Sequence, residues 1–209
     1  MIIGVDSNQL AKGSHEKSNR ANHQRLVSMG HILVPLAIPY GDYIQITPEI
    51  DEIIKAKGDK LSKKDLDGKI TISVDRKNSI DEICGNLCSN QKEHERFRNE
   101  LIAAQKSNCR MFAVIENTEG IKSLDDIRKW SNPRLHRYNK INYMHRLGKW
   151  QNVKLSGQRP PCDNVRLMKT MLTCESRYKC KFVFCSPYES AQKIVELLSG
   201  EGAENGKGT

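Results

Sequence analysis

Three charged side chains near the middle of the sequence have the types and the spacing of a hydrolytic site. Asp75 and Lys77 lie two residues apart at the end of an alternating segment, so on a β-strand both side chains leave the same face. Asp42 follows Gly41 in an earlier turn, from which a neighbouring strand can deliver a second carboxylate. Two carboxylates can bind Mg²⁺ or Mn²⁺, which lowers the pKa of a bound water, while the ammonium offsets charge growing on a phosphodiester. The three residues therefore predict metal-dependent hydrolysis of a phosphodiester.

Each of these residues also has a structural explanation that involves no chemistry. An aspartate after a glycine is common in turns because its side chain accepts local hydrogen bonds, which is sufficient for Asp42. Asp75 and Lys77 can form a simple ion pair. Separate explanations of this kind account poorly for the three residues occurring together, so the hydrolytic hypothesis is favoured.

The elements predicted around these residues alternate between strands and helices. Apolar runs and alternating segments predict strands at 2–5, 31–39, 43–46, 69–77, 110–116 and 180–185, of which 31–39 contains prolines typical of an edge strand. Helical spacing and capping residues predict helices at 18–29, 79–87, 90–106, 123–130, 164–178 and 186–199, the last opened by Ser186. This alternation favours a single α/β domain over residues 1–199. The remaining segments are a charge-dense surface insertion at 47–68, a region without clear period at 131–163, and a Gly-rich tail at 200–209 that we expect to be disordered.

The residues around Asp42 and Asp75 resemble a known signature. Gly41-Asp42, followed by an extended segment and then Val74-Asp75-Arg76-Lys77-Asn78-Ser79-Ile80-Asp81, is similar to the GD…(E/D)RKxxxD motif of the XPF-type structure-specific nuclease domain, a branch of the PD-(D/E)xK restriction-like nucleases. The resemblance covers residues 2–116, with a weaker similarity over 167–198. It implies an α/β fold of the restriction-endonuclease type, in which helices flank a mixed central sheet.

The resemblance also implies roles for individual residues. Asp42 and Asp75 would bind Mg²⁺ or Mn²⁺, Lys77 would be catalytic, and the backbone carbonyl of Arg76 would add a metal ligand. Arg76 and Asp81 would be supporting members of the site. Both also have structural explanations, because Arg76 can pair with an acid of the following helix and Asp81 can interact favourably with the dipole of that helix.

The sequence departs from the family signature in places. After Asp6 it has Ser7-Asn8-Gln9 where the family has Arg-Glu, so the additional metal-binding acid is either Asp6 itself or Glu16 from the following loop. Asp75 replaces the usual glutamate, which keeps the charge but shortens the side chain. The C-terminal part contains no Gly-rich helix-hairpin-helix pair, the element through which many such nucleases bind DNA and dimerise.

Basic residues gather between Arg128 and Lys169, a stretch that we call the basic segment. Its cations outnumber its acids by far, which is typical of a surface that binds a polyanion. The aromatic residues interleaved with them, namely Trp130, Tyr138, Tyr143 and Trp150, suit stacking on unpaired bases, although they can instead anchor a solvated loop to the core. The residues expected to bind DNA are Arg128, Lys129, Arg134, Arg137, Lys140, Arg146, Lys149, Trp150, Lys154 and Arg159.

Composition excludes several classes of protein. The 209 residues carry 34 Lys and Arg against 25 Asp and Glu, a net charge of +9 that favours a polyanionic partner. With 37% hydrophobic residues and no apolar run of about 18 residues, no membrane span or membrane partner is expected. The first residues lack the pattern of a secretory signal, so we expect an intracellular, cytoplasmic protein and leave a nuclear location open.

The cysteines do not form a recognisable motif. There are seven, and no two have the CxxC spacing, so reduced and mostly buried thiols are expected. A composite zinc site formed by Cys84, Cys88, Cys180 and Cys185 is the alternative, although its spacings are unusual.

Together these observations predict a Mg²⁺- or Mn²⁺-dependent DNA endonuclease, which the resemblance directs to branched, flap or junction DNA in repair or recombination. The alternatives are a catalytically inactive DNA-binding module of the same fold and a nuclease that acts on RNA. A homodimer is also left open.

Overall fold

The centre of the fold is one mixed β-sheet of six strands. In the computed structural model, which describes residues 1–7, 16–89, 91–155 and 160–200, the strand order is β2-β1-β3-β4-β5-β6. The strands are β1 (Ile2–Asp6), β2 (Ile32–Leu36), β3 (Tyr43–Gln45), β4 (Ile72–Lys77), β5 (Arg110–Glu116) and β6 (Lys181–Cys185). β3 runs antiparallel to both of its neighbours, and the other three pairs are parallel. The predicted α/β fold with a mixed central sheet is confirmed.

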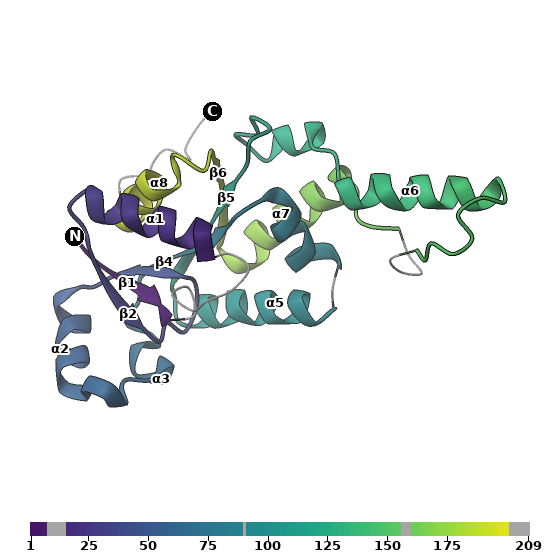
Figure 1. Ribbon diagram of the computed structural model, residues 1–209. Coiled ribbons are helices and arrows are strands. Elements are labelled where there is room, and N and C mark those ends of the chain that lie inside the picture. The colour runs from purple at the N-terminus through teal and green to yellow at the C-terminus, as the bar shows by residue number, and fades with distance from the viewer. Residues whose placement is uncertain (8–15, 90, 156–159, 201–209) are drawn as a thin grey trace.

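Helices cover both faces of this sheet (Figure 1). α1 (Glu16–Ser28) and α8 (Ser190–Leu198) contribute Leu26 and Ile194 to the core on one face. α4 (Ile80–Cys84), α5 (Gln91–Lys106) and α7 (Asn164–Tyr178) form the core on the other face, where Phe97 and Leu167 are buried. β4 lies between two neighbours, and all of its residues from Ser73 to Lys77 are buried. Charged side chains on this strand must therefore find partners.

Several elements match the sequence-based prediction closely. β5 and α7 have the expected bounds, and β2 is an edge strand, as its prolines indicated. Gly30 adopts a φ of 84° just after α1, which is the left-handed conformation that commonly ends a helix at glycine.

Three segments differ from the sequence-based expectation. Residues 47–68, predicted as a surface insertion between two strands, form α2 (Pro48–Lys57), the 3₁₀ turn η2 (Gly58–Lys60) and α3 (Lys63–Leu66), and bury Ile50 and Leu66 in the core. Residues 131–163, for which no element was predicted, contain α6 (Pro133–Arg146). The last helix begins at Ser190, because the carboxylate of Glu189 accepts a hydrogen bond from the Ser186 amide and forms a turn ahead of it.

The remaining elements are short. η3 (Gly85–Ser89), one π-helical turn, continues α4, and η4 (Asp125–Lys129) is a 3₁₀ turn ahead of α6. The tail at 201–209 lies outside the described residues. Within the described ranges, no helix is long and apolar enough to cross a membrane.

Candidate active site

Gly41 places Asp42 beside β4, the strand that carries Asp75 and Lys77. Its φ of 77° is a conformation that other residues rarely adopt, and a Cβ at this position would lie 3.2 Å from the carbonyl oxygen of Val74. The Asp42 amide donates to that same oxygen over 2.8 Å, and Oδ2 of Asp42 accepts from the Arg76 amide over 2.8 Å. The turn between β2 and β3 thus holds the Asp42 carboxylate on the backbone of β4.

Asp75 and Lys77 leave the same face of β4, as the alternation predicted. Nζ of Lys77 lies 3.0 Å from Oδ1 and 2.8 Å from Oδ2 of Asp75, and both side chains are buried. The ammonium also lies 5.1 Å from the centre of the Phe97 ring on α5. Asp42, Asp75 and Lys77 are therefore brought together, at the carboxyl end of the strand.

Burial and neighbouring charges shift the pKa values of Asp42 and Lys77. Burial, followed by the neighbouring Asp75 carboxylate, raises the pKa of Asp42 well above its ordinary value. Burial alone would lower the pKa of Lys77, but the carboxylates of Asp75 and Asp42 reverse this effect and raise it. The site therefore concentrates negative charge that one ammonium only partly compensates.

A further carboxylate, which sequence reasoning missed, joins this cluster from α5. Oε1 of Glu100 accepts a hydrogen bond of 2.6 Å from the Gly41 amide. Burial and then the Asp75 carboxylate raise the pKa of Glu100, so its carboxyl group lies within electrostatic reach of the site. Glu100 falls between Phe97 and Leu101 on the buried face of α5. An acid at a core-facing helical position was the signal that could have identified it.

These residues line one cleft of about 670 Å³. Its lining is rich in charge: the acids are Asp6, Asp42, Asp75, Glu82, Glu93 and Glu100, and the cations are Lys63, Lys77 and Arg96, whereas Arg76 also lines the cleft but directs its guanidinium elsewhere. The acids outnumber the cations although the whole chain is basic, so the cleft is suited to cations.

Arg76 points to the opposite face of the sheet. Its Nε donates to Glu116 on β5 over 2.6 Å, Nη1 donates to Asn19 over 2.9 Å, and Nη2 donates to Ser18 over 2.6 Å. The side chains of Arg76 and Glu116 are each only 3% exposed. The expected pairing of Arg76 with an acid of the next helix is wrong, because strand alternation directs its side chain towards α1 and away from α4.

Of the other predicted acids whose side chains are described, Asp6 lines the cleft and Asp81 does not. Asp6 ends β1, its amide donates to the Asp42 carbonyl over 2.9 Å, and Lys63 lies 3.9 Å from its carboxylate. Asp81 lies in the first turn of α4 and forms a 2.7 Å ion pair with Arg134 at the start of α6. Glu16 is the first residue of α1, and its side chain lies outside the described residues.

The basic segment spans several elements. Its cations lie on η4 (Arg128, Lys129), on α6 (Arg134, Arg137, Lys140, Arg146), in the chain after α6 (Lys149 and Lys154, with Trp150 between them) and on α7 (Arg166, Lys169), whereas Arg159 lies outside the described residues. α6 projects from the body of the molecule (Figure 1). Trp130 is only 4% exposed and belongs to the core, so the prediction that it stacks on bases is wrong.

The cysteines are free and mostly buried, as expected. The composite zinc site is wrong, because Cys185 faces the core on the α1 and α8 side whereas Cys84 and Cys180 face the opposite one. Cys84 and Cys88 instead contact Cys162. Across the described residues, no group of three or more His, Cys, Asp or Glu side chains is arranged to hold a metal ion.

The comparisons with known proteins bear on the fold. No protein-family model and no curated protein matches the sequence. Among solved structures, XPF from Aeropyrum pernix is similar with a TM-score of 0.50 and 14% sequence identity, over 98% of this chain. The fold is XPF-like. This chain covers 66% of the length of the Aeropyrum protein, and at this identity the likeness establishes the XPF-like fold alone.

Proposed function

We propose that this chain is a Mg²⁺- or Mn²⁺-dependent DNA endonuclease. The observation that carries the proposal is the convergence of Asp42, Asp75 and Lys77 in one polar cleft at the end of β4. The XPF-like fold and the similarity of the surrounding motif support the same activity. Branched, flap or junction DNA is the substrate that the motif resemblance favours.

The carboxylates fit a divalent cation chemically. Oδ2 of Asp75 is buried, and the Lys77 ammonium, 2.8 Å away, balances its charge. A hard cation prefers such oxygen ligands. Asp42 and Asp75 would hold it, and Glu100 would have to move closer to join them, since no three such side chains are arranged as ligands among the described residues. Asp6, Glu16 and the Arg76 carbonyl are the additional ligands that the motif implies. When bound, the cation lowers the pKa of water and neutralises charge on the phosphodiester.

Lys77 has two roles in this proposal. In the structure described, its ammonium balances the charge of Asp75. If a cation balanced that charge, the Lys77 ammonium would be available to orient the attacking water and to stabilise negative charge developing on the phosphoryl oxygens. The raised pKa keeps Lys77 charged at neutral pH, as this role requires.

The supporting residues hold β4 and the start of α6 in place. Arg76 joins β4 to α1 and β5 on the far face of the sheet, and so fixes the strand that carries Asp75 and Lys77. Asp81 anchors the start of α6 through Arg134. The cations of α6 would bind DNA phosphates beside the cleft.

A cleavage assay tests this function. End-labelled linear, flap and four-way-junction DNA is incubated with the protein in Mg²⁺, Mn²⁺ or EDTA, beside the Asp75→Ala variant. We expect metal-dependent cuts that the variant does not make. A folded protein that binds all three DNAs without cutting them, and binds equally well as Asp75→Ala, would support the inactive DNA-binding module, and cleavage of RNA alone would support the ribonuclease.

Glu100 should contribute to metal binding. The Glu100→Gln variant keeps the size of the side chain and an acceptor for the Gly41 amide but loses one negative charge. We expect the Mn²⁺ concentration for half-maximal cleavage, and the Mn²⁺ dissociation constant measured by calorimetry, to rise about tenfold, the scale of a lost supporting ligand. Glu93→Gln is the matched control, because Glu93 lines the same cleft but is paired with Arg96 and 38% exposed. Equal Mn²⁺ affinities for the two variants would contradict this role.

The cations of α6 should bind phosphates without reading sequence. Replacing Arg137, Lys140 and Arg146 together with glutamine is expected to weaken DNA binding for every sequence and to reduce the slope of log K against log salt by about three. Fluorescence anisotropy over a salt series measures both. The matched control replaces Lys55, Lys57 and Lys60, which lie on α2 and η2 at the other end of the molecule. If the slope of log K against log salt were unchanged in the α6 variant, the three α6 cations would not contact the DNA phosphates.

A further inference from the structure

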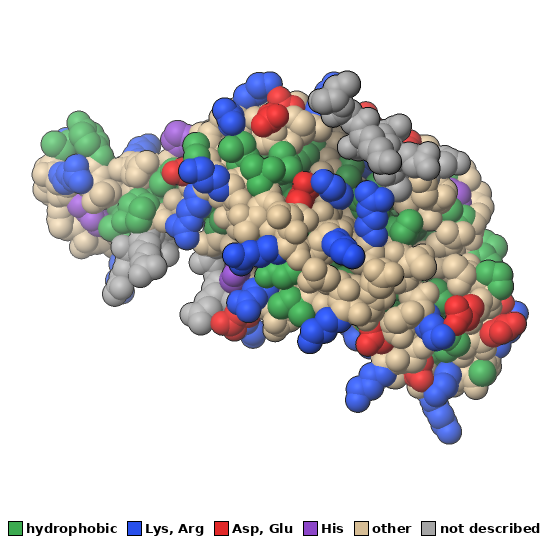
Figure 2. Space-filling model, turned by 180° about the vertical axis from the view of Figure 1, so that it is seen from behind, with side chains coloured by type: hydrophobic (Ala, Val, Ile, Leu, Met, Phe, Trp, Pro, Cys, Tyr) green, Lys and Arg blue, Asp and Glu red, His purple; other side chains and the backbone are tan. Residues whose placement is uncertain are grey.

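The arm formed by α6 and residues 147–155 is poorly packed on the protein. Of the fourteen residues of α6, all of them described, only Ile141 is buried. Figure 2 shows hydrophobic side chains gathered at the far end of the arm. Exposed large side chains on the arm are Tyr143 (61%), Leu147 (52%), Trp150 (42%) and Val153 (37%). An exposed apolar group of this kind on a projecting element is typical of a binding surface.

The turn after α6 holds Trp150 in one position. The Lys149 amide donates to the Met144 carbonyl over 2.9 Å, Nε2 of His145 lies 2.9 Å from the Trp150 carbonyl oxygen, and the Val153 amide donates to that same oxygen over 2.9 Å. Trp150 has a φ of 54°, a left-handed conformation that is costly for a tryptophan and persists only where its surroundings impose it. The turn is thus ordered, and it presents the indole ring to solvent.

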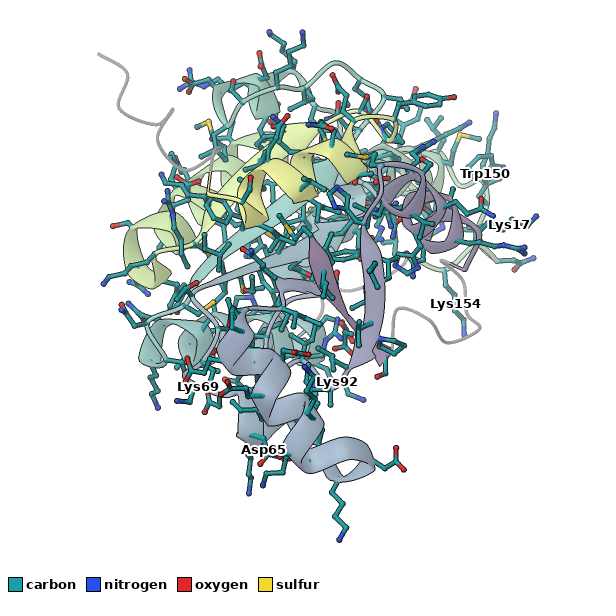
Figure 3. The ribbon with its side chains drawn as sticks, turned by 90° about the vertical axis from the view of Figure 1, so that its left-hand side faces the viewer. Lys17, Asp65, Lys69, Lys92, Trp150 and Lys154 are labelled. Atoms are coloured by element: carbon teal, nitrogen blue, oxygen red, sulfur yellow. The ribbon has the colours of Figure 1, made fainter. Side chains whose placement is uncertain are left out.

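One cation packs on this ring, and others are close to it in the sequence. Nζ of Lys140 lies 5.5 Å from the centre of the Trp150 ring, and Lys149 is the residue before it. Residues 127–162 contain nine Lys and Arg and no Asp or Glu. Figure 3 shows Trp150 and Lys154 at the same edge of the molecule, away from the part that carries Asp65 and Lys69. The ligand of this surface must therefore be anionic and must also offer flat apolar faces.

Unpaired nucleic acid has both properties. We propose that the arm binds single-stranded nucleic acid, with bases stacked on Trp150 and Tyr143 and the flanking phosphates bound by Lys140 and Lys149. Base stacking on aromatic side chains beside cations is how single strands are bound without sequence preference. In a duplex the faces of the bases are covered by their neighbours, so the arm prefers unpaired segments. The inference rests on the proposed function only in taking nucleic acid as the partner, and it requires no cleavage.

Tryptophan fluorescence tests this directly, because the chain has two tryptophans and Trp130 is buried in the core. The protein is titrated in EDTA with a short oligothymidylate. We expect the fluorescence to be quenched on binding, the Trp150→Leu variant to lose the quenching and bind about tenfold more weakly, and Trp150→Phe to retain most of the affinity. Tyr188→Leu is the matched control, because Tyr188 is 81% exposed but lies against Arg25 away from the arm.

Three results would overturn the inference. These are unchanged oligothymidylate affinity in Trp150→Leu, equal quenching by a blunt duplex, and Trp150-dependent binding to phosphatidylserine vesicles in place of the oligonucleotide, which would indicate a lipid surface. The cleavage assay separates this inference from the proposed function. If the protein binds the oligonucleotide through Trp150 but cuts no DNA, the inference about the arm stands and the proposed nuclease function fails. If it cuts DNA but does not bind the oligonucleotide through Trp150, only the inference about the arm fails.

Discussion

Replacing Asp42 with asparagine is expected to lower the rate of DNA cleavage at least about a hundredfold and, at the same time, to make the metal-free protein more stable. The loss of rate follows from removing one of the two carboxylates that are proposed to hold the metal. The gain in stability follows from the raised pKa of Asp42, which means that its ionised form is disfavoured in the folded state. Stability is therefore lost as the pH rises through that pKa, and asparagine avoids this loss.

The variant keeps the local hydrogen bond, since an asparagine oxygen can still accept from the Arg76 amide. At neutral pH and in EDTA we expect the free energy of unfolding to rise by about 1 kcal/mol, which is typical of a single stabilising substitution. Thermal unfolding followed by circular dichroism measures this, beside single-turnover cleavage. Asp59→Asn, which changes an exposed acid, should alter neither quantity. A destabilised Asp42→Asn protein, or one that cleaves at the normal rate, would contradict this account of the site.

Replacing Arg76 with methionine is expected to cost about 3–5 kcal/mol of stability, because it leaves the Glu116 carboxylate buried without its partner. Adding Glu116→Leu should restore much of that loss, since the pair would then be replaced by apolar side chains of similar size. Chemical denaturation of the single and double variants measures both effects, and the cycle they form gives the coupling energy.

A second Arg–carboxylate pair provides a matched control. Arg134 and Asp81 are 2.7 Å apart, but their side chains are 51% and 35% exposed. Arg134→Met should therefore cost less than about 1 kcal/mol, as is usual for pairs in contact with water. If Arg76→Met and Arg134→Met lowered the free energy of unfolding equally, the buried hydrogen bonds of Arg76 would not be what holds β4 in place.

Patterns within single elements predicted much of this molecule. The alternation of residues 69–77 placed Asp75 and Lys77 on one face, and the contact of 2.8 Å between them confirms it. The turn at Gly41 was expected to bring Asp42 from a neighbouring strand, and β3 does lie beside β4. These features depend on the geometry of single strands, which is set by residues close together in the sequence.

The features that the sequence did not predict depend on which distant segments of the chain contact one another. α6 has no apolar face, and in the described part of the chain Ile141 is its one buried residue, so hydrophobic periodicity could not identify it. Glu100 reaches the site only because α5 packs beside the turn at Gly41, 59 positions earlier in the chain. Likewise, the partner of Arg76 is Glu116 because β4 and β5 are neighbours, and the sequence left several acids available for this role.

The most direct test of the central claim is anomalous diffraction from crystals of the protein soaked in Mn²⁺. The account predicts a manganese peak between the carboxylates of Asp42 and Asp75, with Nζ of Lys77 moved away from Asp75, and no such peak in crystals of Asp75→Asn. Saturating Mn²⁺ that leaves the Lys77–Asp75 ion pair intact, or binds only outside this cleft, would contradict it.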